Sequence, residues 1–405
     1  MRRKAGLRGL VTGALLTIAG LLVGWLCVRE TLVRVLPAAS SDLLAIAAHD
    51  PDIVLERASA ALVRQRGILA PATLDAVRAA AAAAPLDARA YLILGHQQLL
   101  DDQPRRAVAT LEAGQRLDPR QRLIHILLLD RYLRTRHYAD ATAQFSVLAR
   151  LMGQTQAPIA TAMAAMMLDP ETREAARRAL ATDPDLERAV LIALARSDTP
   201  ATTVVALASP AARASAGNAQ SWGPVLVTRL VERGRFAAAR AVWQRINDLP
   251  DAAAAAAIFN PGFAASPASA PFNWTLAAGG LGAADSAQGG LAVDYYGRDS
   301  GDLAGQLVLL APGRYRFSVV VDPGKTDAAA RLAWTLACAG GNGTALMTAP
   351  VAAGVARRRI SADFTVPAGC PAQALALHGD AGEFPVPVAL TLRQPDIRPL
   401  PEARR

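Results

Sequence analysis

Apolar and polar residues alternate along several short segments in the C-terminal third of the chain. Segment 313–322 (GRYRFSVVVD) carries its aromatic and β-branched residues on one side. The same period of two recurs further on, in segments 331–338, 359–366 and 384–392. This period, with one apolar side, is typical of half-buried β-strands, and turn-forming runs such as GGNG separate the segments. Many short strands of this kind predict an antiparallel β-sandwich over residues 258–396.

Residues 41–248 follow a helical spacing instead. Small and large apolar residues pair at i, i+4, as in Ala107 with Leu111 and Ala141 with Phe145, which places each pair on one helical face. Two Asp-Pro dipeptides, each with a Glu close behind, are typical helix starts because acidic residues suit the positive end of the helix dipole. This part of the chain is therefore expected to form an irregular α-solenoid of helical hairpins.

Composition marks the boundary between the two patterns. Alanine and leucine dominate up to about residue 258, and glycine, proline, threonine and valine dominate after it. The predicted fold class is thus a multidomain α plus β protein. Its expected parts are a cytoplasmic tip with a transmembrane anchor, a helical repeat domain, a β-sandwich and a disordered tail, at residues 1–34, 41–248, 258–396 and 397–405.

The N-terminal segment predicts the cellular location. Residues 9–28 contain no charged side chain, which is enough to cross a bilayer as a helix, and four basic residues precede them. Positive charge favours the cytoplasmic side, so we expect a single-pass inner-membrane protein with a cytoplasmic N-terminus and a periplasmic bulk. A cleaved signal peptide is the alternative.

Three cysteines are present. Cys27 lies within the predicted anchor and is expected to remain unpaired. Cys338 and Cys370 both lie in the sandwich region, where a periplasmic location would permit a disulfide bond between them. Buried free thiols are the alternative.

Prolines 51, 85 and 119 are spaced by 34 residues, each beside an acidic residue. With the small and aromatic residues around them, this part of the chain resembles tetratricopeptide repeats. The resemblance assigns the following residues to packing within and between hairpins: Tyr91, Gly95, Ala107, Pro119, Tyr138, Ala141, Phe145, Phe236, Ala239 and Trp243.

The same resemblance implies a concave groove that holds a peptide or a partner protein. By position, Arg89, His96 and Asp130 are the candidates for lining it, and ordinary solvated residues are the alternative interpretation. His125 and His137 are expected at the surface.

The C-terminal region resembles jelly-roll domains of the carbohydrate-binding or galactose-binding-like kind. The similar stretches are FNPGF (259–263), PFNWTL (271–276), the predicted strand before YYGRDSGD (295–302) and the strand in APGRYRFSVVV (311–321). The resemblance implies glycan contacts through aromatic faces, amides and acids on loops, with these candidates: Asn273, Trp274, Tyr295, Tyr296 and Asp299. The alternative is that Trp274 and Tyr295 pack in the core or at an edge.

Charge and motifs limit the chemistry. The net charge is +9, but the arginines are spread along the helical part, which does not favour nucleic-acid binding. No G-x-S-x-G sequence or histidine spacing typical of a metal site occurs, so we expect no catalytic residue, cofactor or metal ion. The expected function is a non-enzymatic periplasmic scaffold, with protein and polysaccharide partners, that supports envelope or exported-polysaccharide assembly. A pure protein–protein adaptor with a structural sandwich cap and a cell-wall glycan hydrolase are the alternatives.

Overall fold

A computed structural model describes part of the chain. Its described residues are the following: 21–29, 31, 47–65, 67–153, 156–250, 256–266, 268–324, 331–341, 345–351, 356–383 and 385–401. Within these ranges, no helix is both long enough and apolar enough to cross a membrane. Most of the predicted anchor at 9–28 lies outside the described residues.

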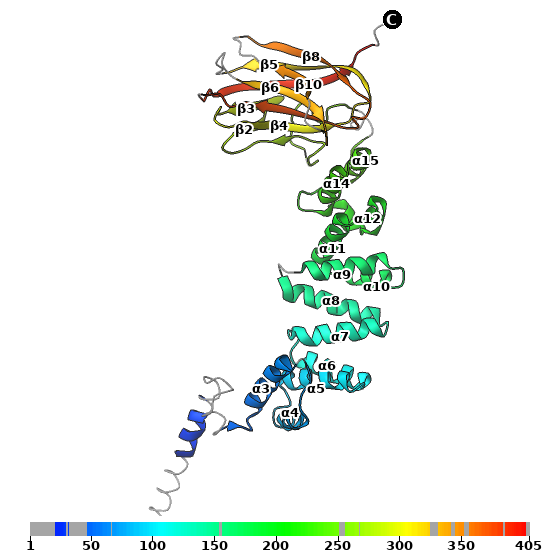
Figure 1. Cartoon of the computed structure of the whole chain (residues 1–405), viewed down its shortest axis with the longest axis vertical. Coiled ribbons are helices and arrows are strands. Elements are labelled where there is room, and N and C mark those ends of the chain that lie inside the picture. Colours follow the sequence, from blue (N-terminus) through cyan, green and yellow to red (C-terminus); the bar gives the residue numbers. More distant parts are fainter. Residues whose placement is uncertain are drawn as a thin grey trace, which may run out of the picture. The chain divides into compact units, whose positions relative to one another are not determined.

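The chain divides into two compact units. The first comprises Met1–Ile159 with Met166–Ala179, and the second comprises Ala160–Ala165 with Leu180–Arg405. Helices of the N-terminal half, drawn in blue to green in Figure 1, are α3 (Pro51–Arg64), α4 (Pro71–Ala83), α5 (Ala88–Leu100), α6 (Pro104–Leu117), α7 (Arg122–Arg134), α8 (Tyr138–Met152), α9 (Ala157–Leu168) and α10 (Arg173–Leu180).

Helices α3–α8 form antiparallel hairpins, α3 with α4, α5 with α6 and α7 with α8. Small residues allow the helices of one hairpin to approach closely. A Cβ atom added at Gly95 would lie 2.6 Å from Cγ of Leu111, and Ala107 and Leu111 have no exposed surface. Ala141 and Phe145 of α8 are buried in the same way. These predicted packing residues therefore lie between helices.

Three further packing candidates lie nearer the surface. Tyr91 is half-buried and donates its hydroxyl to the carbonyl oxygen of Pro85 over 2.9 Å. Tyr138 begins α8 and its hydroxyl contacts a carboxylate oxygen of Glu171 at 3.3 Å. Pro119 is exposed and stands in the turn between α6 and α7.

His125 corrects a prediction, because its side chain is 1% exposed rather than at the surface. Its Nδ1 lies 2.6 Å from Oε1 of Gln144, and its Nε2 lies 2.9 Å from the carbonyl oxygen of Pro119. The ring thus ties α7 to α8 and to the preceding turn. These polar partners explain why a histidine is tolerated in a core position. His137 is exposed, as predicted.

The second unit adds the remaining helices, α11 (Pro184–Arg196), α12 (Ala201–Leu207), α13 (Pro210–Ala214), α14 (Trp222–Glu232) and α15 (Phe236–Ile246). Helix α14 packs against α11 and α15. The Asp183 carboxylate caps α11 by accepting a hydrogen bond from the backbone N–H of Leu186 over 3.1 Å, as the Asp-Pro pattern predicts.

Two antiparallel five-stranded sheets form the C-terminal sandwich (Figure 1). Sheet A has the order β1-β4-β9-β6-β7 and sheet B the order β2-β3-β10-β5-β8. The strands are β1 (Thr275–Leu276), β2 (Gly282–Ala287), β3 (Gly290–Tyr295), β4 (Gly301–Val308), β5 (Gly313–Pro323), β6 (Leu332–Cys338), β7 (Ala345–Pro350), β8 (Arg358–Val366), β9 (Gln373–Gly379) and β10 (Val388–Pro399).

One apolar core fills the space between the sheets. Alternate residues of each strand enter it, such as Phe317 and Val319 of β5 and Trp334 and Leu336 of β6, none of which has exposed surface. The predicted β-sandwich is confirmed. Strand β10 runs to Pro399 and Ile397 is 5% exposed, so the prediction of a disordered tail from residue 397 is wrong for these residues.

Helix α15 belongs to the same unit as the sandwich. Phe236, Ala239 and Trp243 are buried, as the repeat pattern predicts, but Trp243 packs against Phe259 and Phe272 of the segment that leads into β1. The boundary near residue 258 that composition predicts therefore falls inside a continuous buried cluster.

Candidate functional site

Of the three residues predicted to line a groove, two bond neighbouring charged side chains and the third packs against a loop. Arg89 stands at the start of α5, where its guanidinium bonds both carboxylate oxygens of Asp87 and also reaches Asp52 of α3. These two carboxylates raise the pKa of Arg89, and Arg89 in turn lowers the pKa of Asp87. Arg89 thus connects α3 and α5 through these ion pairs.

Asp130 and His96 are occupied in other ways. Asp130 accepts a 2.8 Å hydrogen bond from Nε of Arg134, one turn further along α7. His96 is half-buried, and a Cβ atom added at Gly67 would lie 3.0 Å from its Cε1, so the ring packs against this loop. Burial lowers the pKa of His96.

Helix α7 does leave apolar side chains exposed. Leu123 is 56% exposed and Ile126 is 48% exposed, and with Asp130 they occupy positions i, i+3 and i+7 of one helical side. We call these three residues the α7 face. The buried residues of α7, among them Ile124 and Leu128, point to the neighbouring helices. The α7 face was not singled out by the sequence pattern, because leucine and isoleucine occur on both sides of this helix.

A concave surface lies between α11 and α14. It encloses about 460 Å³ and is lined by Arg196, Pro224, Val225, Thr228, Arg229 and Glu232. Arg229 contacts the carboxylate of Glu232 at 3.3 Å. Nothing in the spacing of these residue types signals a site, which is why sequence analysis did not find this cavity.

In the sandwich, three of the predicted glycan contacts are core residues. Trp274 is 9% exposed and lies between Phe263 and Trp334, with ring centroids 4.7 and 5.9 Å away. Asn273 is 8% exposed and donates to the carbonyl oxygen of Ala268 over 2.6 Å.

Tyr295 is 1% exposed and donates its hydroxyl to the carbonyl oxygen of Asp299 over 2.9 Å. A Cβ atom at Gly379 would lie 2.7 Å from its ring, so the tyrosine fills the space beneath β9. Since a sugar can reach none of Asn273, Trp274 and Tyr295, the structure corrects their assignment as glycan contacts. The physical reason is that the segment leading into β1 directs Asn273 and Trp274 inward, and that Tyr295 ends β3 on the same core-facing side as Leu291 and Val293.

The other two candidates remain on the surface. Tyr296 is 43% exposed, and Asp299 is exposed on the loop from β3 to β4. Near this loop, Nδ1 of His378 lies 2.7 Å from Asp302 and its Nε2 lies 3.5 Å from Asp380. Among the described residues, no group of His, Cys, Asp and Glu side chains is arranged to hold a metal ion.

The outer side of sheet A is covered by small residues. One row crosses all five strands in register, consisting of Thr275, Gly305, Ala376, Thr335 and Thr348. A neighbouring row consists of Ala374, Ala337 and Ala345, and ends on β4 at Leu307, which is only 8% exposed. Sugar-binding surfaces present aromatic rings to the sugar, and neither row contains one. This side of the sandwich is therefore not an aromatic-lined trough.

The outer side of sheet B is charged. Its residues on β5, β8 and β10, with Arg357 just before β8, include six arginines and three aspartates, namely Arg314, Arg316, Arg357, Arg359, Arg393, Arg398, Asp322, Asp363 and Asp396. We call this set the arginine face. The sequence contains a signal for the arginine face, because arginines 314 and 316 alternate with the core-facing residues Tyr315 and Phe317.

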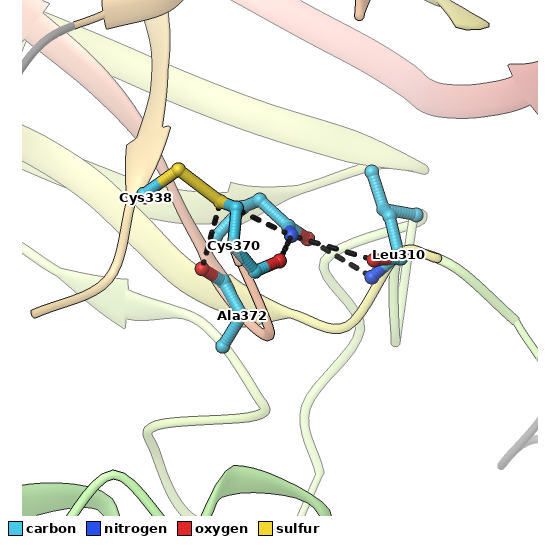
Figure 2. Close-up of a disulfide and its surroundings, with 5 residues drawn as sticks. Leu310, Cys338, Cys370 and Ala372 are labelled. Carbon is cyan, nitrogen blue, oxygen red and sulfur yellow. Dashed lines mark hydrogen bonds between the residues drawn. A yellow bond between two sulfur atoms is a disulfide. The ribbon is translucent and has the colours of Figure 1, made fainter. Parts of the chain in front are cut away.

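A disulfide bond joins Cys338 at the end of β6 to Cys370, the pair for which sequence analysis allowed a bond. Figure 2 shows this disulfide with Leu310 and Ala372 nearby. The side-chain amide of Gln373 hydrogen-bonds to Leu310 and Cys370. The amide Nε2 donates to the carbonyl oxygen of Cys370 over 2.7 Å, and Oε1 accepts from the backbone N–H of Leu310 over 2.9 Å. The disulfide thus fixes the entry to β9.

No protein-family model matches this chain, and no curated protein matches it. The C-terminal region resembles in fold the β-sandwich of solved carbohydrate-binding modules. One is TmCBM61 in complex with β-1,4-galactotriose, at 16% identity over 36% of this chain and 99% of that one, with a TM-score of 0.25.

Another is the N-terminal cellulose-binding domain of Cellulomonas fimi β-1,4-glucanase C, at 16% identity over 33% of this chain and 93% of that one, with a TM-score of 0.25. A CBM4 module matches at 16% identity over 29% of this chain and 89% of that one, with a TM-score of 0.23. These TM-scores are low, and the β-sandwich fold of this chain follows from its strand order and register.

Proposed function

We propose that this protein is a non-enzymatic scaffold of the cell envelope, whose tetratricopeptide-like hairpins bind a protein partner and whose β-sandwich is an attached binding module. The observation that carries the proposal is the α7 face. Leu123 and Ile126 expose about half of their surface side by side on a helix whose other apolar residues are buried or partly buried. Apolar residues at i and i+3 with an acid at i+7 are suited to a partner helix or an extended peptide.

The intramolecular partners of the predicted groove residues support a structural role for them. Arg89 and Asp130 are each engaged by a neighbouring charge, so binding through them would require those ion pairs to open. The two apolar residues of the α7 face, Leu123 and Ile126, are exposed and require no such rearrangement. We therefore place the partner on Leu123 and Ile126.

The proposed location is the periplasm, with residues 9–28 as the inner-membrane anchor. The Cys338–Cys370 disulfide supports it, because such bonds persist in oxidising compartments and are rare in the cytoplasm. A fusion of alkaline phosphatase after residue 401 tests this point. The enzyme should be active, and activity confined to a cytoplasmic reporter would overturn both the location and the anchor.

Glycan binding by the sandwich is the second candidate function, and one observation favours it. Tyr296 and Asp299 lie exposed on one loop, where an aromatic face and a carboxylate are available together. Exported polysaccharide would be the ligand. Replacing Tyr296 with alanine should then weaken retention on a neutral-glycan affinity gel, whereas alanine at the buried Tyr295 would act through stability.

Site-specific crosslinking tests the scaffold proposal. A photoreactive residue at position 126 should form a discrete adduct with one protein in intact cells, and Leu123→Ser should reduce its yield. The matched controls are Val63 for the photoreactive residue and Leu86→Ser for the substitution, since these side chains are 83% and 80% exposed outside the α7 face. If position 63 gave the same adduct, or position 126 gave none, the proposal would be wrong.

A further inference from the structure

The arginine face lies on the opposite side of the sandwich from the small-residue rows of sheet A, and strand register fixes its layout. Arg398, Arg316 and Asp363 stand in one row across β10, β5 and β8. Arg393, Val320 and Arg359 stand in another row across the same strands. Neighbouring strands are about 4.8 Å apart, and residues two apart on a strand about 7 Å, so the guanidinium groups form a regular array.

On β5, β8 and β10 arginine exceeds aspartate, so this part of the outer side is positive, whereas the neighbouring strands β2 and β3 add the exposed Asp285 and Asp294 to the same side. Asp322 is shared by Arg393 at 2.5 Å and Arg357 at 3.1 Å, and Asp363 is held by Arg316. Arg359 donates to the hydroxyl of Ser318 at 3.3 Å and forms no ion pair with a carboxylate in the described part of the chain. Arg314 is exposed to solvent, and its charge contributes to lowering the pKa of Asp363.

The face already holds a carboxylate in the geometry that an acidic ligand would use. Nε and the second guanidinium nitrogen of Arg316 bind the two oxygens of Asp363 at 2.5 and 2.9 Å. Two parallel bonds of this kind are the preferred arginine–carboxylate arrangement. Arginines 314 and 359 can offer the same geometry to carboxylates of a ligand.

Hydroxyl groups alternate with the arginines. Ser318 faces Ser361 across β5 and β8, and Thr365 and Thr391 occupy outward positions beside Arg314 and Asp322. Hydroxyls of this kind exchange hydrogen bonds with other hydroxyls, as a sugar chain would provide. Charged and hydroxyl groups together match a polymer that carries both.

Other anionic partners fit this surface less well. Val320, the apolar residue at the centre of the arginine face, is only 7% exposed. Its side chain is therefore not available for insertion into a lipid bilayer. Binding of single-stranded nucleic acid relies on exposed aromatic rings, but Tyr315 and Phe317 of β5 point to the core side. A flat sheet of five strands also does not enter a duplex groove.

We propose that the arginine face binds an acidic polysaccharide, with carboxylated sugars paired to Arg314 and Arg359 and sugar hydroxyls bound by the intervening serines and threonines. This inference is independent of the α7 face and of the loop that carries Tyr296. The described rows on the outer side of sheet A carry no comparable charge.

Affinity electrophoresis of the full chain in detergent tests the proposal, with polygalacturonate as the probe. Methyl-esterified polygalacturonate has the same backbone without the charge, and vesicles of phosphatidylglycerol and oligo-dT represent the lipid and nucleic-acid alternatives. We expect retardation by polygalacturonate alone, weakened by salt because exposed ion pairs are screened.

The double variant Arg314→Glu/Arg359→Glu should weaken this binding at least about tenfold, since it replaces attraction by repulsion at two charge-assisted contacts. The control Arg105→Glu/Arg120→Glu makes the same change of net charge at exposed positions in α6 and in the turn that follows it, and should leave binding within about twofold. Arg314→Lys/Arg359→Lys, which keeps the charge but loses the paired geometry, should give an intermediate loss.

Equal losses in the glutamate variant and its control would show a non-specific charge effect and overturn the proposal. Equal retardation by the esterified polymer, or preferred binding to vesicles or oligo-dT, would overturn it as well. A circular dichroism spectrum and melting temperature equal to the wild type establish that the variant is folded. Crosslinking from position 126 should persist in it, which separates this inference from the proposed protein contact.

Discussion

The indole Nε1 of Trp243 donates a hydrogen bond to the carbonyl oxygen of Ser269 over 2.7 Å. The ring has no exposed surface and meets Phe259 edge-on at 5.0 Å. The guanidinium carbon of Arg240 lies 4.8 Å from the centre of the same ring and 5.2 Å from that of Phe272. A helix residue and the segment leading into the sandwich therefore share one buried cluster.

The first prediction concerns this cluster. Trp243→Ala should lower the free energy of unfolding by about 3–5 kcal/mol, because it leaves a large cavity and an unpaired carbonyl oxygen. Trp243→Phe retains most of the packing and should cost less. Urea denaturation followed by circular dichroism measures both values.

A pair of fragments gives the corresponding control. A fragment beginning at residue 180 should unfold cooperatively, and one beginning at residue 258 should be less stable because it exposes Phe259 and Phe272. Equal stability of the two fragments would contradict the role assigned to Trp243.

The second prediction concerns close helix packing at Gly95. A Cβ atom there would lie 2.6 Å from Cγ of the buried Leu111, so Gly95→Ala should destabilise the protein by about 1–3 kcal/mol despite the better helix propensity of alanine. Thermal melting of Gly95→Ala and of a control variant, Gly305→Ala, measures the effect. At Gly305 the nearest atom would be 3.8 Å away, so Gly305→Ala is the tolerated control.

A compensating substitution sharpens this test. Leu111→Ala removes the atoms that Gly95→Ala would meet, so the double variant should lose less stability than the two single losses added together. Strict additivity would mean that the glycine is not required for the approach of α5 and α6.

Parts of the fold that depend on near neighbours in sequence were predictable. Alternation alone placed Phe317, Trp334 and Phe364 in the core, because the side-chain period of a strand requires only that one face be buried. The i, i+4 pairing of Ala107 and Leu111 identified a helix contact for the same reason. These are local patterns whose consequence does not depend on the rest of the chain.

Parts that depend on how a loop folds were not predictable. Trp274 and Tyr295 resemble sugar-stacking residues in type, but the segment before β1 turns Trp274 inward, and Tyr295 ends β3 on the core-facing side with Leu291 and Val293. His125 is buried because Gln144 and Pro119, from other elements, supply polar partners. Nothing in the local sequence specifies such long-range contacts, and the same holds for the contact of Trp243 with Ser269.

The third prediction concerns the disulfide. Replacing Cys338 and Cys370 by serine should lower the free energy of unfolding by about 2–4 kcal/mol, because the bond restricts the unfolded chain and fixes the start of β9. Denaturation with and without reductant measures this. Reductant should destabilise the wild type and have no effect on the double variant, and an identical response of both proteins would refute a structural role for the bond.

The last prediction follows from the contact between Asp87 and Arg89. The Arg89 guanidinium holds the pKa of Asp87 below its usual value, so the unfolded state binds the proton more readily than the folded state. The ionised carboxylate therefore stabilises the fold above the unfolded-state pKa, and this contribution is lost as the pH falls through the folded-state pKa. Asp87→Asn removes the charge but keeps an N-cap residue for α5.

At neutral pH the asparagine variant should be less stable by about 0.5–1 kcal/mol, a modest value because the pair is partly solvated. The difference should shrink as the pH is lowered below about 4. Urea denaturation at a series of pH values measures it, with Arg89→Gln expected to show the same trend. A difference that stayed constant down to pH values below the folded-state pKa would show that the capping geometry, and not the charge of Asp87, stabilises this junction of α3 and α5.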